Sequence, residues 1–256
     1  MLRETLATLE SSRKELSEAL KSEKELGELK SRFVTMASHE FKTPLSTILS
    51  SSFLLEKYND TNEANKRLKH IARIQNAVDD MKNILDDFLS LGKLEEGLIH
   101  ADVNALEADE CFNEIWHVIN EMKTHCKENQ EISFTHSGDD NVQLDKHLLK
   151  NILYNLLSNA IKFSSANTRI EVNCIIQKDK FIISIKDEGI GISEEDKQHL
   201  FERFFRAKNA INIQGPGLGL HIVSKYLELM QGSIYLESNL NEGSVFTISI
   251  PQKIGV

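Results

Sequence analysis

The segment Asp187-Glu188-Gly189-Ile190-Gly191-Ile192 follows directly on the apolar run Phe181–Lys186. Two glycines just past a predicted strand allow the chain to turn sharply and to lie against a flat ligand. The carboxylate of Asp187 is placed to accept a hydrogen bond from an exocyclic amine, which would select adenine over guanine. Taken alone, the segment is equally explained as a plain turn between a strand and a helix.

Upstream, three asparagines share one face of the helix predicted over Asp145–Phe163. Asn151, Asn155 and Asn159 are each four residues apart, which places them on one side of a helix. Their amide oxygens suit a hard cation and their NH₂ groups suit phosphates, without the repulsion that carboxylates bring. Lys162, one turn after Asn159, can reach a phosphate. Such asparagines are otherwise ordinary surface residues.

Downstream, Gly215-Pro216-Gly217-Leu218-Gly219-Leu220 opens the helix predicted over Gly217–Met230. Glycines at a helix start expose backbone N–H groups, and the helix dipole favours an anion there. The spacing matches neither a P-loop nor a dinucleotide-binding fingerprint.

Between the two glycine segments, Phe201-Glu202-Arg203-Phe204-Phe205-Arg206 leads into the polar stretch Ala207–Gln214. We expect a hinged lid here, with Arg203 or Arg206 meeting a terminal phosphate. Ordinary core packing is the alternative for the aromatic residues.

The first 95 residues have a different pattern. Leu2, Leu6, Leu9, Leu16 and Leu20 follow heptad spacing, which predicts a coiled coil over residues 1–29, with a change of phase between residues 20 and 26. A fraying helix end is the alternative for residues 1–20.

A second helical run, Glu63–Lys93, follows the polar turn Tyr58–Asn62. Two long helices with a short connection predict an antiparallel hairpin over residues 30–95. One hairpin cannot bury both apolar stripes, so we expect a homodimer built as a four-helix bundle. The alternative is a hairpin packed on its own second domain.

A linker is expected at 96–103, followed by a second domain at 104–252. Helical and strand-like runs both occur in the second domain, and its last strands are spaced as hairpins. The chain is therefore predicted to be multidomain, with an all-α hairpin followed by an α+β sandwich that has a mixed sheet. The predicted helices are Asp109–Lys127, Asp145–Phe163 and Gly217–Met230, and the strands are Ile132–Thr135, Arg169–Gln177, Phe181–Lys186, Ser233–Glu237 and Ser244–Ile250.

Composition excludes several classes of protein. The chain has 256 residues and a net charge of −9, which argues against binding to nucleic-acid phosphates. No apolar stretch approaches the roughly 20 residues needed to span a bilayer, and the charged N-terminus is no signal peptide. Three separated cysteines indicate neither a disulfide framework nor zinc. We expect a cytoplasmic chain, or the cytoplasmic part of a longer protein, without membrane contact.

A candidate nucleophile lies on the first helix, in Ser38-His39-Glu40-Phe41-Lys42-Thr43-Pro44-Leu45. Glu40 can take the proton from one ring nitrogen of His39 and leave the other as nucleophile. Thr43 lies one turn further on. Pro44 removes an N–H and is expected to bend the helix. The alternative is a proline kink beside an incidental histidine.

Together these segments resemble the sensor histidine kinases of two-component systems. Their domains are a HisKA phosphoacceptor hairpin and an ATP-binding domain of the GHKL or Bergerat fold. Asn155–Ser164 resembles the N box, Asp187–Ile192 the G1 box, Phe201–Arg206 the F box, Gly215–Leu220 the G2 box, and Gly232 with Gly243–Phe246 the closing hairpin. Ser38–Leu45 resembles the H box, with Lys42 in place of the usual Arg.

The resemblance implies an ATP site. It makes Asn159 the Mg²⁺ ligand, with Asn155 beside it. Asp187 would bind the adenine amine, and Lys162 and Arg206 would bind the phosphates. The remaining nucleotide-binding residues that it implies are Phe163, Gly189, Gly191, Ile192, Phe204, Gly215, Gly217, Leu218, Gly219 and Leu220.

The resemblance also implies the reaction. His39 would be phosphorylated with Glu40 as general base, and the phosphoryl group would pass to an aspartate of a response-regulator receiver domain. Glu40 and Thr43 match the pattern linked to phosphatase activity toward that partner. Relatives that hydrolyse ATP tend to carry Glu at the position of Asn155, and an amide is a poor base. The alternatives are a GHKL-type ATPase acting as a conformational switch, a non-catalytic dimerisation scaffold, and a kinase that works chiefly as a phosphatase.

Overall fold

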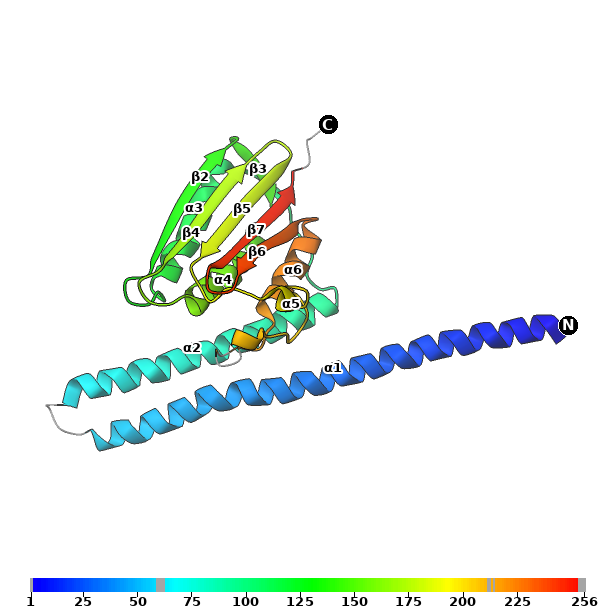
Figure 1. Ribbon diagram of the computed structural model, residues 1–256, viewed down its shortest axis with the longest axis horizontal. Coiled ribbons are helices and arrows are strands. Elements are labelled where there is room, and N and C mark those ends of the chain that lie inside the picture. The colour runs from blue at the N-terminus through cyan, green and yellow to red at the C-terminus, as the bar shows by residue number, and fades with distance from the viewer. Residues whose placement is uncertain (1, 59–62, 211–212, 214, 253–256) are drawn as a thin grey trace. The chain divides into compact units, whose positions relative to one another are not determined.

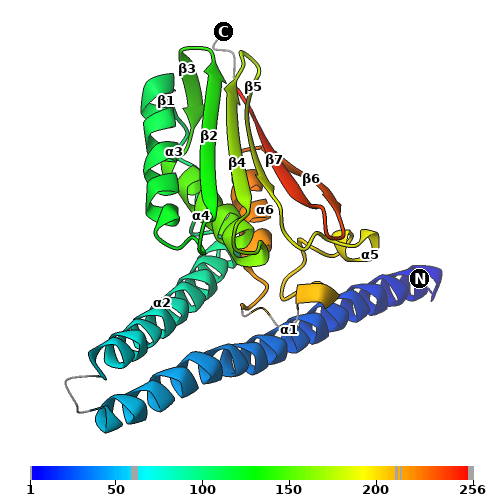
Figure 2. The ribbon, with the colours of Figure 1, turned by 60° about the vertical axis from the view of Figure 1, so that its left-hand side comes forward.

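The computed structural model describes residues 2–58, 63–210, 213 and 215–252 (Figures 1 and 2). The chain divides into two compact units, residues 1–83 and residues 84–256. The division falls inside the second helix, so the end of that helix belongs with the α+β fold.

Two long helices, α1 (Leu2–Lys57) and α2 (Ala64–Glu95), confirm the helical hairpin region. The helix α1 runs without interruption through Pro44, which is buried. Near the turn, the Tyr58 and His70 rings stack with centroids 5.6 Å apart, and Arg67 donates to the Tyr58 carbonyl at 3.1 Å. Residues 59–62 of the predicted turn lie outside the described residues.

The coiled coil expected over residues 1–29 remains a prediction. The backbone there is helical, but most of its side chains, including Leu2, Leu6 and Leu9, lie outside the described residues. Leu16 and Leu20 are 70% and 67% exposed.

The second unit holds a mixed five-stranded sheet in the order β2-β4-β5-β7-β6. The strands β2 and β4 are parallel, whereas all other neighbours in this sheet are antiparallel, which confirms the predicted mixed sheet. The strands are β2 (Glu131–Gly138), β4 (Arg169–Ile176), β5 (Lys180–Asp187), β6 (Ser233–Asn239) and β7 (Gly243–Pro251).

Three helices, α3 (Ala108–Lys123), α4 (Lys146–Phe163) and α6 (Gly219–Leu229), cover one face of this sheet (Figure 2). Burial alternates along β4, so every second side chain enters the core. Ile152, Leu157 and Ile183 are fully buried there. Asp145 caps α4 by accepting hydrogen bonds from the N–H groups of His147 and Leu148.

Several short elements were not predicted from the sequence. A separate antiparallel pair joins β1 (Asn104–Glu107) to β3 (Asn141–Leu144). The one-turn helix α5 (Glu194–Lys197) precedes the F box, and the 3₁₀ turn η2 (Lys208–Ala210) lies within the stretch Ala207–Gln214 that was expected to form the lid. Elements of three or four residues are too short to show a hydrophobic period.

Candidate functional site

Asp187 ends β5 and is 5% exposed. Its Oδ1 accepts the Gly189 N–H at 2.8 Å. Burial raises the pKa of Asp187 to about 6, although the backbone N–H groups of Gly189 and Ser244 act in the opposite direction. A buried acceptor of this kind is suited to bind a polar edge of a ligand.

The two G1-box glycines lie where no side chain fits. A Cβ on Gly189 would come 2.9 Å from the Phe163 carbonyl oxygen, and Ile190 donates to that same oxygen at 3.2 Å. Gly191 has φ +64°, and a Cβ there would lie 1.8 Å from the Asn239 carbonyl oxygen. The G1 box is thereby held against the end of the N box.

On α4, Asn155 is oriented by its own helix. Its Nδ2 donates to the Asn151 carbonyl at 3.0 Å. Its Oδ1 lies 2.5 Å from the place that a Cβ on Gly219 would occupy, so the amide oxygen faces the start of α6. Asn159 is half-buried one turn further along.

Lys162 also faces the G2 box. Its Nζ lies 2.8 Å from the position of a Cβ on Gly215, where φ is +145°. The same ammonium is 5.4 Å from the centroid of the half-buried Phe163 ring. A cation beside a glycine-rich helix start is the arrangement that binds phosphates.

The F and G2 boxes contact each other at the two ends of the lid. Phe204 has φ +63° and donates its N–H to the Gly217 carbonyl at 3.0 Å. Gly217 has φ +69°, and a Cβ there would come 2.6 Å from the Phe205 carbonyl oxygen. Left-handed Phe204 is uncommon for a bulky residue, and the hydrogen bond to Gly217 holds it.

Further residues that were predicted to bind the nucleotide differ in their burial and in their hydrogen-bond partners. Arg206 donates to the carbonyls of Ala210 and Ile213, at 3.3 and 2.6 Å, so its guanidinium holds the lid backbone in this structure. The side chain of Leu218 is fully buried, whereas Ile192 and Leu220 are half-buried. Residues 211–212 and 214 of the predicted lid lie outside the described residues.

A buried serine pair behind the G1 box was not predicted from the sequence. Ser238 Oγ accepts the Ile192 N–H at 2.9 Å, donates to the Gly243 carbonyl at 2.8 Å and lies 2.9 Å from Ser244 Oγ. This pair connects the closing hairpin to the G1 box. The only signal in the sequence is that both serines flank the turn ahead of the last strand.

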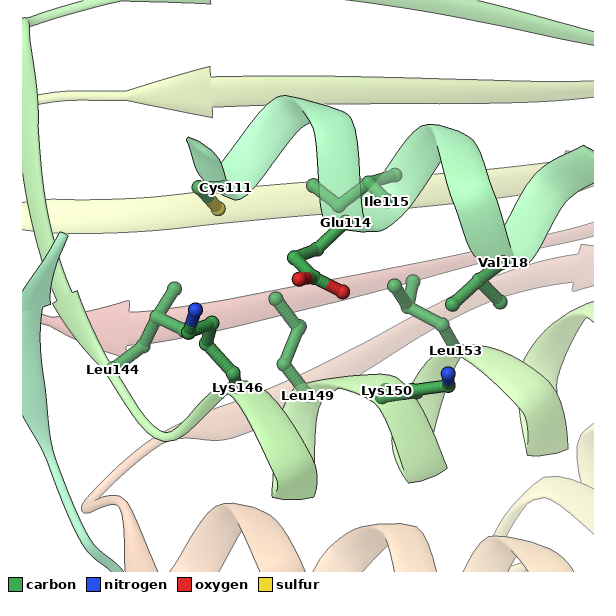
Figure 3. A pocket seen from close by; sticks show the side chains of 9 residues that line it. All are labelled: Cys111, Glu114, Ile115, Val118, Leu144, Lys146, Leu149, Lys150 and Leu153. Atoms are coloured by element: carbon green, nitrogen blue, oxygen red, sulfur yellow. The ribbon is translucent and has the colours of Figure 1, made fainter. Parts of the chain in front are cut away.

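A cavity between α3 and α4 lies apart from these boxes (Figure 3). In Figure 3 the Glu114 carboxylate points into the gap between the two helices, on the side of Lys146 and Lys150. The cavity volume is about 10 Å³, which is room for one water at most. It is therefore too small for a nucleotide.

No group of three or more His, Cys, Asp and Glu side chains with metal-site geometry occurs among the described residues. A divalent cation at the boxes would therefore rely on amide oxygens and on ligand phosphates. The Oδ1 of Asn155, which faces the start of α6, fits this role, because amide oxygens are acceptable ligands for hard cations.

In the first unit, His39 is exposed and Glu40 is buried. The side chains are 76% and 4% exposed, and His39 Nδ1 lies 3.4 Å from Glu40 Oε1. Thr43 is exposed one turn further on. The geometry leaves Nε2, the nitrogen that does not face Glu40, available as a nucleophile.

Comparisons with known proteins agree with this division. A model of the histidine kinase-, DNA gyrase B- and HSP90-like ATPases matches residues 144–254, and a model of the His Kinase A phospho-acceptor domain matches residues 29–97. Sensor histidine kinase GacS of Pseudomonas protegens is 33% identical over 97% of this chain, and the chain spans 28% of its length.

Two solved structures share the fold over most of the chain. Histidine kinase ThkA in complex with response regulator protein TrrA is 25% identical with a TM-score of 0.63, covering 89% of this chain and 62% of that one. Full-length ShkA in complex with AMPPNP is 26% identical with a TM-score of 0.60, covering 86% of this chain and 45% of that one.

The fold and the convergence of the boxes define an ATP-binding domain of the class that includes histidine kinases. With the phosphoacceptor domain ahead of it, the chain belongs to the sensor histidine kinases of two-component systems. In the part of the chain that the structure describes, no helix is long and apolar enough to cross a membrane.

Proposed function

We propose that the chain is an ATP-dependent, autophosphorylating protein histidine kinase that phosphorylates His39 and passes the phosphoryl group to an aspartate of a response-regulator receiver domain. The observation that carries the proposal is the convergence of the N, G1, F and G2 boxes in a chain that also presents an exposed His39 beside a buried Glu40. Because ATP is the donor, a cytoplasmic location follows from this proposal.

Each box has a role in holding ATP. Asp187 accepts the adenine amine, and Lys162 with the start of α6 binds the phosphates. Asn155 and Asn159 would hold Mg²⁺, which neutralises phosphate charge when bound. Arg206 joins the phosphates only after it leaves the lid carbonyls that it contacts in this structure.

The transfer itself is a displacement at phosphorus. Nε2 of His39 attacks the γ-phosphorus, the bond to the β–γ bridging oxygen breaks, and ADP leaves with that oxygen. The Nδ1 proton moves to Glu40, whose Oε1 lies 3.4 Å away. Asn155 cannot activate water as a carboxylate does, which favours histidine over water as the acceptor.

Replacing His39 with Gln should abolish phosphorylation of the chain. The wild type incubated with Mg²⁺ and [γ-³²P]ATP should carry label that is lost in acid and stable in base, as expected for a phosphoramidate. His117→Gln, at another exposed histidine, should label normally. Release of free phosphate without labelling of the protein would favour the ATPase alternative, and absence of nucleotide binding would favour the scaffold.

An exposed apolar stripe supports a homodimer. On α1, Leu45, Leu49 and Phe53 recur every four residues and are 51%, 59% and 59% exposed. On α2, Leu68 and Val78 are 63% and 51% exposed. A single chain leaves these side chains in water, and a second copy of the hairpin would bury them as a four-helix bundle.

Leu49→Glu should dissociate this dimer. Burying one Leu contributes about 1.5–3 kcal/mol, and in a two-fold dimer the change occurs twice. We expect the dissociation constant to rise by at least about 100-fold, measured by analytical ultracentrifugation. Ser50→Glu, at the exposed neighbouring position, should leave the dimer intact. Equal effects of the two substitutions would place the interface elsewhere.

The receiver partner and a phosphatase activity are further parts of the proposal. The ThkA–TrrA complex supports a receiver as partner, because that kinase shares this fold. Thr43 supports a phosphatase role, because it is exposed one turn from His39 and its hydroxyl can position a water molecule.

Thr43→Ala should therefore lengthen the lifetime of the phosphorylated receiver by at least about 10-fold, with autophosphorylation of His39 unchanged. Thr47→Ala is the matched control, since Thr47 lies one turn further and bonds to the Thr43 carbonyl at 3.2 Å. The measurement is decay of label on a receiver phosphorylated in advance. An unchanged lifetime in Thr43→Ala would count against the phosphatase role.

A further inference from the structure

The last turn of α4 carries Lys162, one of the residues that we assign to the nucleotide. A helix ends with carbonyl groups that have no partner inside it. Because α4 ends at Phe163, the carbonyl groups of its last turn need donors from other segments. The Lys162 ammonium lies 2.8 Å from the position of a Cβ on Gly215 in the G2 box. Whatever holds this end of the helix therefore also sets where the ammonium lies.

Lys127, in the segment between α3 and β2, supplies a donor to two of these carbonyl groups. Its Nζ donates to the Lys162 carbonyl at 2.9 Å and also to the Ser164 carbonyl. A cation at the carbonyl end of a helix is favoured by the helix dipole as well. The two acceptors lie on either side of Phe163 in the chain, so one ammonium fixes the backbone across the end of α4.

A tight turn holds Lys127 in this place. The Lys127 N–H donates to Gln130 Oε1 at 3.1 Å, and the Gln130 N–H donates to the Lys127 carbonyl at 3.0 Å. Gln130 is 7% exposed, and its Nε2 lies 3.4 Å from the carbonyl oxygens of Ile161 and Ser165. The turn over residues 127–130 is therefore anchored to the same helix end that the Lys127 ammonium contacts.

The carbonyl group between the two acceptors of Lys127 is bonded by the G1 box. The Ile190 N–H donates to the Phe163 carbonyl at 3.2 Å. The segment 162–164 is thus held both by the G1 box and by a lysine that lies 35 residues before Lys162 in the chain. None of the boxes found in the sequence includes Lys127.

We propose that Lys127 is a positioning residue for the nucleotide phosphates, because its ammonium holds the carbonyl end of α4 and thereby keeps the Lys162 ammonium at the G2 box. This inference rests on the proposed function, since it assigns Lys162 to the phosphates. Without the Lys127 ammonium, the carbonyl groups of Lys162 and Ser164 lose this donor, and the last turn of α4 frays. The Lys162 side chain is then less well placed before ATP binds, and the phosphates are bound more weakly.

The test is the affinity of the full chain for Mg·AMPPNP, measured by calorimetry. Lys127→Met removes the ammonium but keeps an unbranched side chain, and it should weaken binding by about 5- to 10-fold. Lys146→Met is the matched control, because Lys146 forms an ion pair with Glu110 at the opposite end of α4. It should change the affinity by less than about 2-fold. Urea unfolding followed by Trp116 fluorescence establishes that each variant is folded under the conditions of the titration.

A second arm repeats Lys127→Met in a Lys162→Met background. If Lys127 acts through Lys162, its replacement should there weaken binding by less than about 2-fold. The positioning role is rejected if Lys127→Met binds as tightly as wild type, or if the full weakening persists without the Lys162 ammonium. In either case the wild type still binds AMPPNP and still labels on His39. No binding by the wild type would instead reject the proposed function, and the positioning role with it.

Discussion

Asp187→Asn is expected to weaken nucleotide binding on the order of 100-fold without destabilising the protein. Asn keeps an oxygen for the Gly189 N–H, which now lies 2.8 Å from Asp187 Oδ1. It replaces the charged acceptor for the adenine amine by a neutral amide. Hydrogen bonds to a charged partner contribute about 1.5–3 kcal/mol, so affinity for Mg·AMPPNP should fall on the order of 100-fold.

Unlike the affinity for the nucleotide, the stability of the folded protein should not fall in Asp187→Asn. The folded pKa of Asp187, about 6, is above its ordinary value of 3.8 because of burial. Because folding raises this pKa, the contribution of the Asp187 carboxyl to the free energy of unfolding is fully present below about pH 4 and is lost as pH rises through about 6. The difference between the two pKa values corresponds to roughly 3 kcal/mol at most. Above about pH 6, Asp187→Asn should therefore be at least as stable as wild type.

Calorimetric titration and urea unfolding between about pH 5 and about pH 8 check both halves of this prediction. Asp179→Asn, at an exposed turn position, should change neither quantity. Loss of binding together with loss of stability in Asp187→Asn would mean that the carboxylate serves the fold rather than the ligand.

Gly191→Ala is expected to destabilise the nucleotide-binding fold severely. The new Cβ would lie 1.8 Å from the Asn239 carbonyl oxygen and 2.6 Å from its carbon, both in the backbone. The left-handed φ of +64° adds about 1–2 kcal/mol. We expect a total loss of about 3–5 kcal/mol, because the end of β6 must move and the Asn241–Ile190 hydrogen bond, 2.9 Å, would break.

Gly97→Ala is the matched control. Gly97 has nearly the same φ, +65°, but nothing lies within 4 Å of a Cβ there. Gly97→Ala should lower the free energy of unfolding by only about 1–2 kcal/mol. The chain has one tryptophan, Trp116 in α3, so its fluorescence follows urea unfolding of the second unit. Equal losses for Gly191→Ala and Gly97→Ala would show that the close approach to Asn239 is not what requires a glycine.

The tight turns at the glycine segments could be predicted from the sequence, because each glycine marks a local backbone conformation or a close approach that other residues disfavour. The positive φ of Gly191, Gly215 and Gly217, and the close approach of the Asn155 side chain to Gly219, explain why glycine is favoured at these positions. The strands were also predictable, since they alternate buried and exposed residues, and the hairpin spacing of the last strands predicted the mixed sheet.

Contacts between distant segments could not be predicted in the same way. Nothing local to Ser90 or Glu95 indicates that they meet Tyr226 and Arg203. The role of Ser238 depends likewise on Ile192, 46 residues away along the chain. Arg206 was expected at a phosphate from its place in the F box, but which acceptor a long side chain reaches depends on the path of the lid backbone.

Phosphorylation of His39 by ATP is the central claim, and peptide mapping tests it most directly. Trypsin should release the peptide Phe33–Lys42, in which His39 is the single histidine. After incubation with Mg·ATP, digestion at alkaline pH and mass spectrometry should find one phosphate on this peptide, located on the imidazole and absent in His39→Gln. A phosphate on Thr35, on Ser38 or on another peptide, or release of ADP with no phosphate on the chain, would contradict the claim.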